Sequence, residues 1–149
     1  MANELSKSEM DRVRMVALYE NLNKFYDEYL SYLDKVCASL IIAALTMRKS
    51  GNEAKYDEMR GVITDISTLM QDGEASKKII EIEIEEMKDG KALKEFNYGD
   101  AEKASRDFKD SLEIVIGRAH KELADTYKER MASFARREKS THNLTQKRK

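Results

Sequence analysis

The chain has 149 residues, of which 37% are charged, and it contains no proline. A chain of this length fits one domain and buries roughly two thirds of its unfolded surface, so it needs neither disulfides nor a metal in order to fold. Because proline is the strongest helix breaker, its absence favours long, uninterrupted helices. The sequence therefore predicts an all-α protein whose charged residues form the outer helix faces.

Cysteine usage and hydrophobicity indicate the compartment. Cys37 is the one cysteine, so an internal disulfide is excluded, which fits a reducing compartment. Its neighbours in the sequence are apolar, which is typical of a core residue. The longest apolar run, Leu40 to Leu45, is far shorter than the roughly 20 residues that span a bilayer. Arg12 and Arg14 interrupt the first apolar cluster, which argues against a signal peptide. We expect a cytoplasmic protein, or a nuclear one in a eukaryotic host, without transmembrane insertion.

The first predicted helix covers residues 6–49. Ser6 and Glu9 match a capping box, in which each side chain binds a free backbone N–H of the other residue. From Val36 to Leu45 nearly every position is apolar, so we expect this end of the helix to be surrounded and the N-terminal half to be less covered. Apolar residues repeat at alternating spacings of four and three, the pattern of supercoiled helices, at Met15, Tyr19, Leu22, Tyr26, Tyr29, Leu33, Val36, Leu40, Ala43 and Met47.

The middle of the chain allows two interpretations. A second helix follows the break at residues 50–52, and the pair Asp72 and Gly73 is expected to end it. Residues 80–85 alternate between isoleucine and glutamate, a pattern that also suits one strand of a β-hairpin. We favour a third helix over about 75–88 with Gly90 as its C-cap, because an isolated hairpin is only marginally stable.

The last predicted helix begins near Asn97, has about 38 residues, and carries an apolar row that ends at Phe134. Residues 140–149 lack periodicity and are expected to form a basic disordered tail, which leaves 1–139 as the domain. The fold prediction is an antiparallel helical bundle whose long first and last helices have coiled-coil character. It has four helices, or three if the second and third merge.

Residues suited to catalysis or cofactor binding are scarce. The histidines, His120 and His142, do not belong to a Glu-x-x-His metal pair. Glycine-rich phosphate loops, a nucleophile elbow and a Cys-x-x-Cys motif do not occur. Glu81 and Glu85 share a helix face, which we interpret as a solvated acidic face rather than a cation site. We therefore expect no catalytic residue, no cofactor and no bound metal.

An aromatic cluster on the first helix is one of two candidate binding features. Its residues fall within fourteen positions and represent five of the eleven aromatic residues of the chain. Core packing is one interpretation. Binding of a partner is the other, because tyrosine is favoured at protein interfaces. The candidate partner-binding residues are Tyr19, Phe25, Tyr26, Tyr29 and Tyr32.

Basic residues at the C-terminal end are the second candidate feature. Residues 126–149 contain eight Lys or Arg and two Glu, a net charge of +6, whereas the whole chain carries −1. Two clusters, Arg136 with Arg137 and Lys147 with Arg148 and Lys149, match the spacing of a bipartite nuclear-import signal. They also suit docking on an acidic protein or on phosphates, although the acidic remainder of the chain disfavours nucleic acid.

These observations together predict a non-enzymatic interaction protein. We expect a subunit, adaptor or chaperone that binds another protein or a second copy of itself through long amphipathic helices. The alternative is an electrostatic binder of nucleic acid or of an anionic surface, acting through the basic tail.

Overall fold

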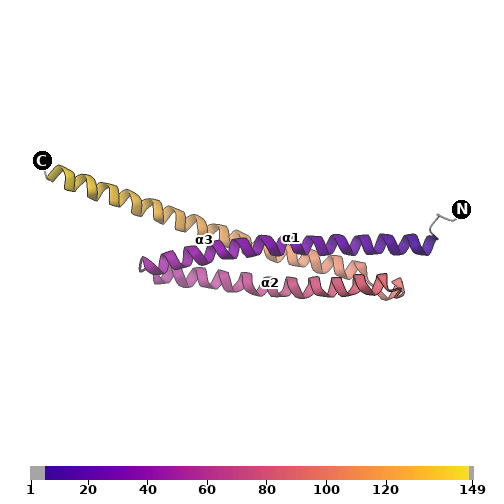
Figure 1. The fold of residues 1–149 in the computed structure, drawn as a ribbon. Helices are drawn as coiled ribbons and strands as arrows, with labels where there is room; N and C mark the ends of the chain where they lie inside the picture. Colours follow the sequence, from indigo (N-terminus) through magenta and orange to yellow (C-terminus); the bar gives the residue numbers. More distant parts are fainter. Residues whose placement is uncertain (1–5, 148–149) are drawn as a thin grey trace.

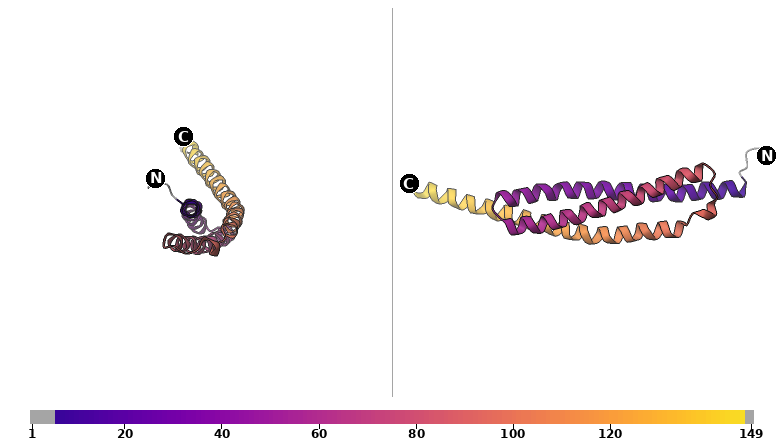
Figure 2. Two further views of the ribbon diagram at one scale, coloured as in Figure 1. Left: turned by 90° about the vertical axis from the view of Figure 1, so that its right-hand side faces the viewer. Right: turned by 90° about the horizontal axis from the view of Figure 1, so that it is seen from below.

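Three long helices form the protein. The computed structural model describes residues 6–147, with side chains described for 6–132 and 134–137. This part of the chain contains no strand; it consists of α1 (Lys7–Lys49), α2 (Glu53–Lys88), the short 3-10 turn η1 (Leu93–Glu95) and α3 (Tyr98–Lys147). α2 runs antiparallel to α1, and α3 returns along the pair in the direction of α1 (Figures 1 and 2). The all-α prediction is confirmed.

Local signals fix the helix ends. The Oγ of Ser6 accepts a hydrogen bond from the N–H of Glu9 at 3.2 Å, and the N–H of Ser6 donates to the Glu9 carboxylate, which confirms the predicted capping box. Gly51 and Gly90, with φ of 84° and 101°, take the left-handed conformation that favours glycine and follow the ends of α1 and α2. The Oδ1 of Asn97 accepts from the N–H of Asp100 at the start of α3.

The expected break at Asp72 and Gly73 is wrong, because α2 runs through both residues. Gly73 is buried against the other two helices instead of ending its own. A Cβ at this position would lie 2.7 Å from Cε2 of Phe108 in α3 and 2.9 Å from Cδ2 of Leu30 in α1. Glycine is therefore placed here by tertiary packing, and the alternative with three helices is the correct one. The alternating residues 80–85 are helical, which also removes the hairpin.

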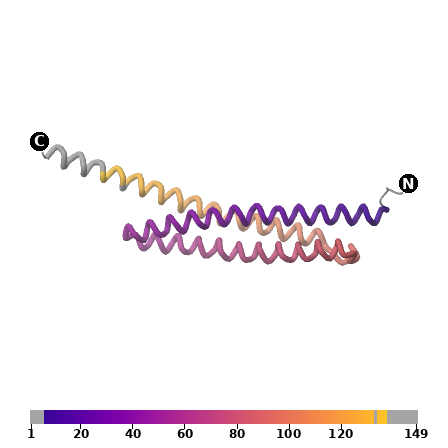
Figure 3. Tube along the Cα trace, viewed as in Figure 1, coloured from indigo at the N-terminus to yellow at the C-terminus, as the bar shows by residue number. Residues whose placement is uncertain are grey.

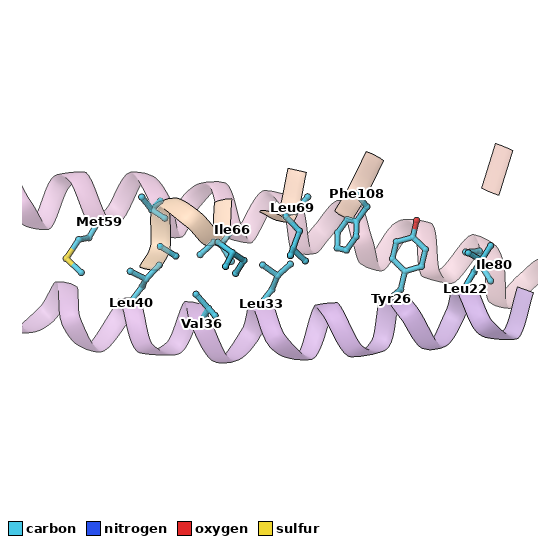
Figure 4. Packing of buried hydrophobic residues seen from close by; sticks show 14 of the residues in the cluster. Leu22, Tyr26, Leu33, Val36, Leu40, Met59, Ile66, Leu69, Ile80 and Phe108 are labelled. Carbon is cyan, nitrogen blue, oxygen red and sulfur yellow. The ribbon is translucent and has the colours of Figure 1, made fainter. Parts of the chain in front are cut away.

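The core is a stripe shared by all three helices along their common length (Figure 4). The fully buried side chains of α1 recur every seven residues, at Tyr19, Tyr26, Leu33, Leu40 and Met47. α2 contributes residues at the same interval, among them Met59, Ile66, Ile80 and Met87, and Gly73 occupies the position between Ile66 and Ile80. Phe108 enters the core from α3 close to Tyr26 and Leu69 (Figure 4).

α3 is longer than the part of it that packs. Asn52 in the turn between α1 and α2 hydrogen-bonds through Nδ2 to the Glu129 carboxylate at 3.4 Å. Beyond Glu129, α3 extends past this turn and away from α1 and α2 (Figures 1 and 2). We call residues 130–147, the part of α3 beyond Glu129, the overhang. The C-terminal end of α3 thus extends beyond its neighbours.

The end of α3 differs from the prediction. Its backbone is helical to Lys147, whereas residues 140–149 are predicted to form a disordered tail. The chain contains no glycine after Gly117 and no proline, so the backbone carries no strong stop signal in this region. The division into a domain of 1–139 and a tail stays a prediction, and Arg148 and Lys149 lie outside the described residues. Figure 3 shows the path of α3 along the Cα trace.

Substitution of Gly73 tests whether the three-helix packing depends on its missing side chain. We expect Gly73→Ala to lower the free energy of unfolding by about 1–3 kcal/mol, because the added methyl group overlaps Phe108 and Leu30. Gly117→Ala is the matched control: it is also helical, and nothing lies within 4 Å of its Cβ position. It should raise stability by about 0.5–1 kcal/mol. Chemical denaturation measures both, and equal effects at the two sites would contradict the packing role.

Candidate interaction surfaces

Four of the five aromatic residues in the predicted cluster are largely inside the bundle. Tyr19 and Tyr26 are fully buried, and Phe25 and Tyr29 are half-buried. The rings of Tyr26 and Phe25 pack against Phe108 of α3, with centroids 5.2 Å and 6.4 Å apart. Fully buried side chains present no surface to a partner, so Tyr19 and Tyr26 act in this structure as core residues.

The fifth aromatic residue, Tyr32, is 40% exposed and joins two helices at the surface. Its hydroxyl shares a hydrogen bond with Nε2 of His120 in α3, at 3.2 Å. His120 is exposed. Tyr32 is therefore the member of the cluster best placed to meet a partner.

Burial raises the pKa of two titratable groups of α1. Burial raises the pKa of the Tyr19 hydroxyl well above its ordinary value, and the nearby Glu83 carboxylate adds to this shift. Cys37 packs half-buried against the core, and burial raises the pKa of its thiol. A protonated thiol is a poor nucleophile. Neither group has the environment of a reactive side chain.

A buried ion-pair network fastens α3 to the start of α2. Nζ of Lys55 lies 2.6 Å from Oε2 of Glu122 and 3.0 Å from Oδ2 of Asp125. Glu122 is only 4% exposed. Burial acts to lower the pKa of Lys55, but its hydrogen bonds to Glu122 and Asp125 outweigh burial and raise that pKa. The same bond to Lys55 lowers the pKa of Asp125. Sequence patterns do not predict this network, because a charged residue within a helix is normally assigned to the solvated face.

Substitution of Lys55 tests how much this network contributes to the stability of the fold. We expect Lys55→Met to lower the free energy of unfolding by about 3–5 kcal/mol, because Glu122 remains buried without its partner. Lys77→Met is the control, since Lys77 pairs with the exposed Asp27 and Glu81, and its loss should cost at most about 1 kcal/mol. Adding Glu122→Leu to Lys55→Met should recover most of the loss. Similar losses for Lys55→Met and Lys77→Met would contradict a buried network.

The pH dependence of the Lys55→Met effect provides an independent check. The pKa of Asp125 is lowered in the folded state, so its contribution is present above its unfolded value of about 3.9 and is lost as the pH falls. The pKa of Lys55 is raised, so its contribution is present below its unfolded value of about 10.4 and is lost as the pH rises through the folded pKa. We expect the stability difference between the native chain and the variant to be largest near neutral pH and to shrink as the pH falls into the acidic range, because acid weakens both the native ion pairs and the penalty of the unpaired carboxylate in the variant.

The turn end of α1 exposes apolar side chains, contrary to the expectation that it is surrounded. Ile41, Ile42 and Leu45 are 44%, 68% and 49% exposed. Two neighbouring helices cover the inner face of α1 and leave its outer face open. A groove of about 320 Å³ lies beside Ile41 and Leu45, lined by α1 and α2 alone, with Tyr56 and Ile63 on the α2 side. We call Ile41, Ile42, Leu45, Tyr56 and Ile63 the α1–α2 patch.

A second row of exposed apolar residues lies where α3 leaves the bundle. Tyr127, Met131 and Phe134 are 65%, 53% and 63% exposed, and their spacings of four and three place them on one helix face. We call these three residues the α3 row. It begins just before the overhang and continues along it.

The basic residues predicted as a binding segment lie in the same part of α3. Arg136 and Arg137 are exposed on the overhang. Lys147 is the last residue of the helical backbone, while Arg148 and Lys149 lie outside the described residues. Arg136, Arg137 and the α3 row thus lie on one helix.

At the opposite end of the bundle, Arg12 ties α1 to the end of α2. Its Nη1 donates hydrogen bonds to the carbonyl oxygens of Met87 and Lys91, each at 2.8 Å. A shallow apolar depression of about 520 Å³ lies beside it, where Val13 and Val16 meet Lys88. The hydrogen bonds to two carbonyls give Arg12 a structural role at this end.

Within the described residues, no group of three or more His, Cys, Asp or Glu side chains has an arrangement that could hold a metal ion. α1 contains an 18-residue window that is long and apolar enough to cross a membrane, and 33% of that window is buried. A core helix of a soluble protein satisfies the same criterion, so this window alone does not assign α1 to a membrane.

Comparison of the chain with protein families, with characterised proteins and with solved structures finds no match. Its function is therefore inferred from its own residues and their arrangement.

Proposed function

We propose that this chain is a non-enzymatic interaction subunit, adaptor or chaperone that binds another protein through long helices of coiled-coil character. The observation that carries the proposal is the α1–α2 patch. Single exposed apolar residues are normal on soluble proteins. Here, however, Ile41 and Leu45 border a groove, and the exposed Ile42 lies next to Ile41 on the same helix. A contiguous apolar surface of this kind is typical of an interaction site.

The shape of the patch supports a helical partner. The spacing of Ile41 and Leu45 places them on one side of α1, and Ile63 meets them across the groove from α2. A helix laid in a groove between two helices buries its apolar face in this way. The sequence makes the turn end of α1 apolar on all sides, and α2 and α3 cover only its inner side. A helix from another molecule would cover the remainder.

The alternative function, electrostatic binding of nucleic acid or an anionic surface, is supported by the positive charge of α3. Lys128, Arg130 and Arg136 are exposed on it. However, the α3 row places large apolar side chains among these cations at helical spacing. Phosphate backbones are bound by cations and hydrogen-bond donors and need no apolar row, whereas apolar rows at this spacing are typical of helix pairing. The protein-binding proposal accounts for both surfaces.

Partner capture from the source cells, with nuclease added, tests the proposal. We expect the tagged full chain to retain a protein in stoichiometric amount, and Ile42→Asp with Leu45→Asp to reduce the retained protein at least about tenfold, because carboxylates would be buried in the interface. Ile114→Asp is the matched control: like Ile42 it is an isoleucine 68% exposed, and it lies outside the patch. Circular dichroism confirms that each variant is folded.

Two results would contradict the proposal. One is an unaltered chain that retains no protein and sediments as a monomer. The other is equal retention by the Ile42→Asp/Leu45→Asp variant and the Ile114→Asp control.

A further inference from the structure

The α3 row continues a face of α3 that already packs against the bundle. Leu123 lies half-buried against the core. Tyr127, Met131 and Phe134 follow it at spacings of four, four and three, so the four residues share one side of the helix. Leu123 is half-buried, and the following three residues are exposed. Beyond Glu129, α3 moves away from α1 and α2, so Met131 and Phe134 lie past the bundle (Figures 1 and 2). The α3 row thus continues, along one side of α3, from a residue that contacts the core.

The overhang is long enough to pair with another helix. It contains 18 residues, from 130 to Lys147, and at about 1.5 Å per residue it spans roughly 27 Å. This corresponds to more than two heptads. Glu129, held by Asn52, and Asp125, held by Lys55, anchor the base of this segment to α2 and the turn. The α3 row therefore begins at a fixed position relative to the bundle.

The charge around the α3 row indicates which kind of helix can bind to it. At about 100° per residue, Lys128 and Arg130 lie on opposite flanks of the row, and both are exposed. The sequence from residue 126 onward has a net charge of +6. A second copy of this helix would place like charges against each other in either orientation, which is unfavourable at the flanks of paired helices. A helix with carboxylates beside its apolar face has the opposite charge and the matching shape.

We propose that the α3 row docks an acidic amphipathic helix of a partner protein. The apolar face of that helix packs on Tyr127, Met131 and Phe134, and its carboxylates meet Lys128 and Arg130. This inference rests on the proposed protein-binding function and adds a second surface to the α1–α2 patch, together with the chemistry of its partner.

Two labelled peptides of about 20 residues, a length at which isolated helices begin to form, serve as probes. They share a row of leucines at heptad spacing; one has glutamates on the flanks and the other has lysines. Fluorescence anisotropy measures the binding of each to the full chain. We expect the glutamate peptide to bind at least about tenfold more tightly than the lysine peptide, and its affinity to fall as salt is added.

Variants of the full chain assign this binding to the α3 row. Met131→Asp should lower the affinity for the glutamate peptide at least about tenfold. Ile114→Asp, also on α3 but outside the row, should leave that affinity unchanged. Lys128→Glu combined with Arg130→Glu should reverse the preference, so that the lysine peptide binds more tightly.

Four results would overturn the inference. Equal binding of the two peptides would show that charge does not select the partner. Unchanged binding of the glutamate peptide to the Met131→Asp variant would show that the α3 row is not its binding site. A single-stranded oligonucleotide of about 20 nucleotides is tested as a competitor. If it displaces the labelled glutamate peptide at a lower concentration than the unlabelled peptide does, the surface binds nucleic acid. A dimer in sedimentation equilibrium that Met131→Asp dissociates assigns it to a second copy.

The proposed function is tested separately from this inference. Capture of a partner by the full chain but not by the Ile42→Asp/Leu45→Asp variant supports the proposed function, even if the glutamate and lysine peptides bind equally well. In that case the function stands and the docking of an acidic helix on the α3 row is wrong.

Discussion

The close packing of Phe108 against Gly73 is the contact on which the three-helix arrangement depends. A glycine inside a helix costs about 1 kcal/mol relative to alanine, and here it leaves space in α2 that the ring of Phe108 occupies, beside Leu30 of α1. Three helices thus meet at one position near the middle of α2. Because the ring of Phe108 also packs on Tyr26 and Phe25, the aromatic residues of α1 are drawn into the core at the same place.

The uncovered surfaces follow from this arrangement. Merging the second and third expected helices leaves the bundle without a fourth helix, so the outer face of α1 at Ile41, Ile42 and Leu45 stays open. The network of Lys55, Glu122 and Asp125 then holds α3 where it passes the turn, and the helix continues beyond α1 and α2. Both candidate surfaces therefore lie toward the turn end of the molecule, one apolar with a groove and one apolar with positive flanks.

The candidate surfaces could be predicted only in part. The positive charge of the C-terminal segment is visible in the sequence, as is the apolar run from Val36 to Leu45. Which side of that run is covered depends on how many helices surround it. Tyr19 and Tyr26 were candidate partner residues by type, yet their heptad positions place them in the core. Glu122 is buried because Lys55, 67 positions away in sequence, provides its counter-charge, a pairing that no local pattern reveals.

The sequence by itself determined the all-helical composition, the start of α1 at its capping box, and the turns at Gly51 and Gly90, because these depend on neighbouring residues along the chain. It also determined the seven-residue interval of buried side chains in α1. Only the tertiary structure decided that Gly73 lies within a helix and that the apolar side chains of Ile42, Met131 and Phe134 remain uncovered. Those outcomes depend on contacts between segments far apart in the chain, and the local patterns are the same for either outcome.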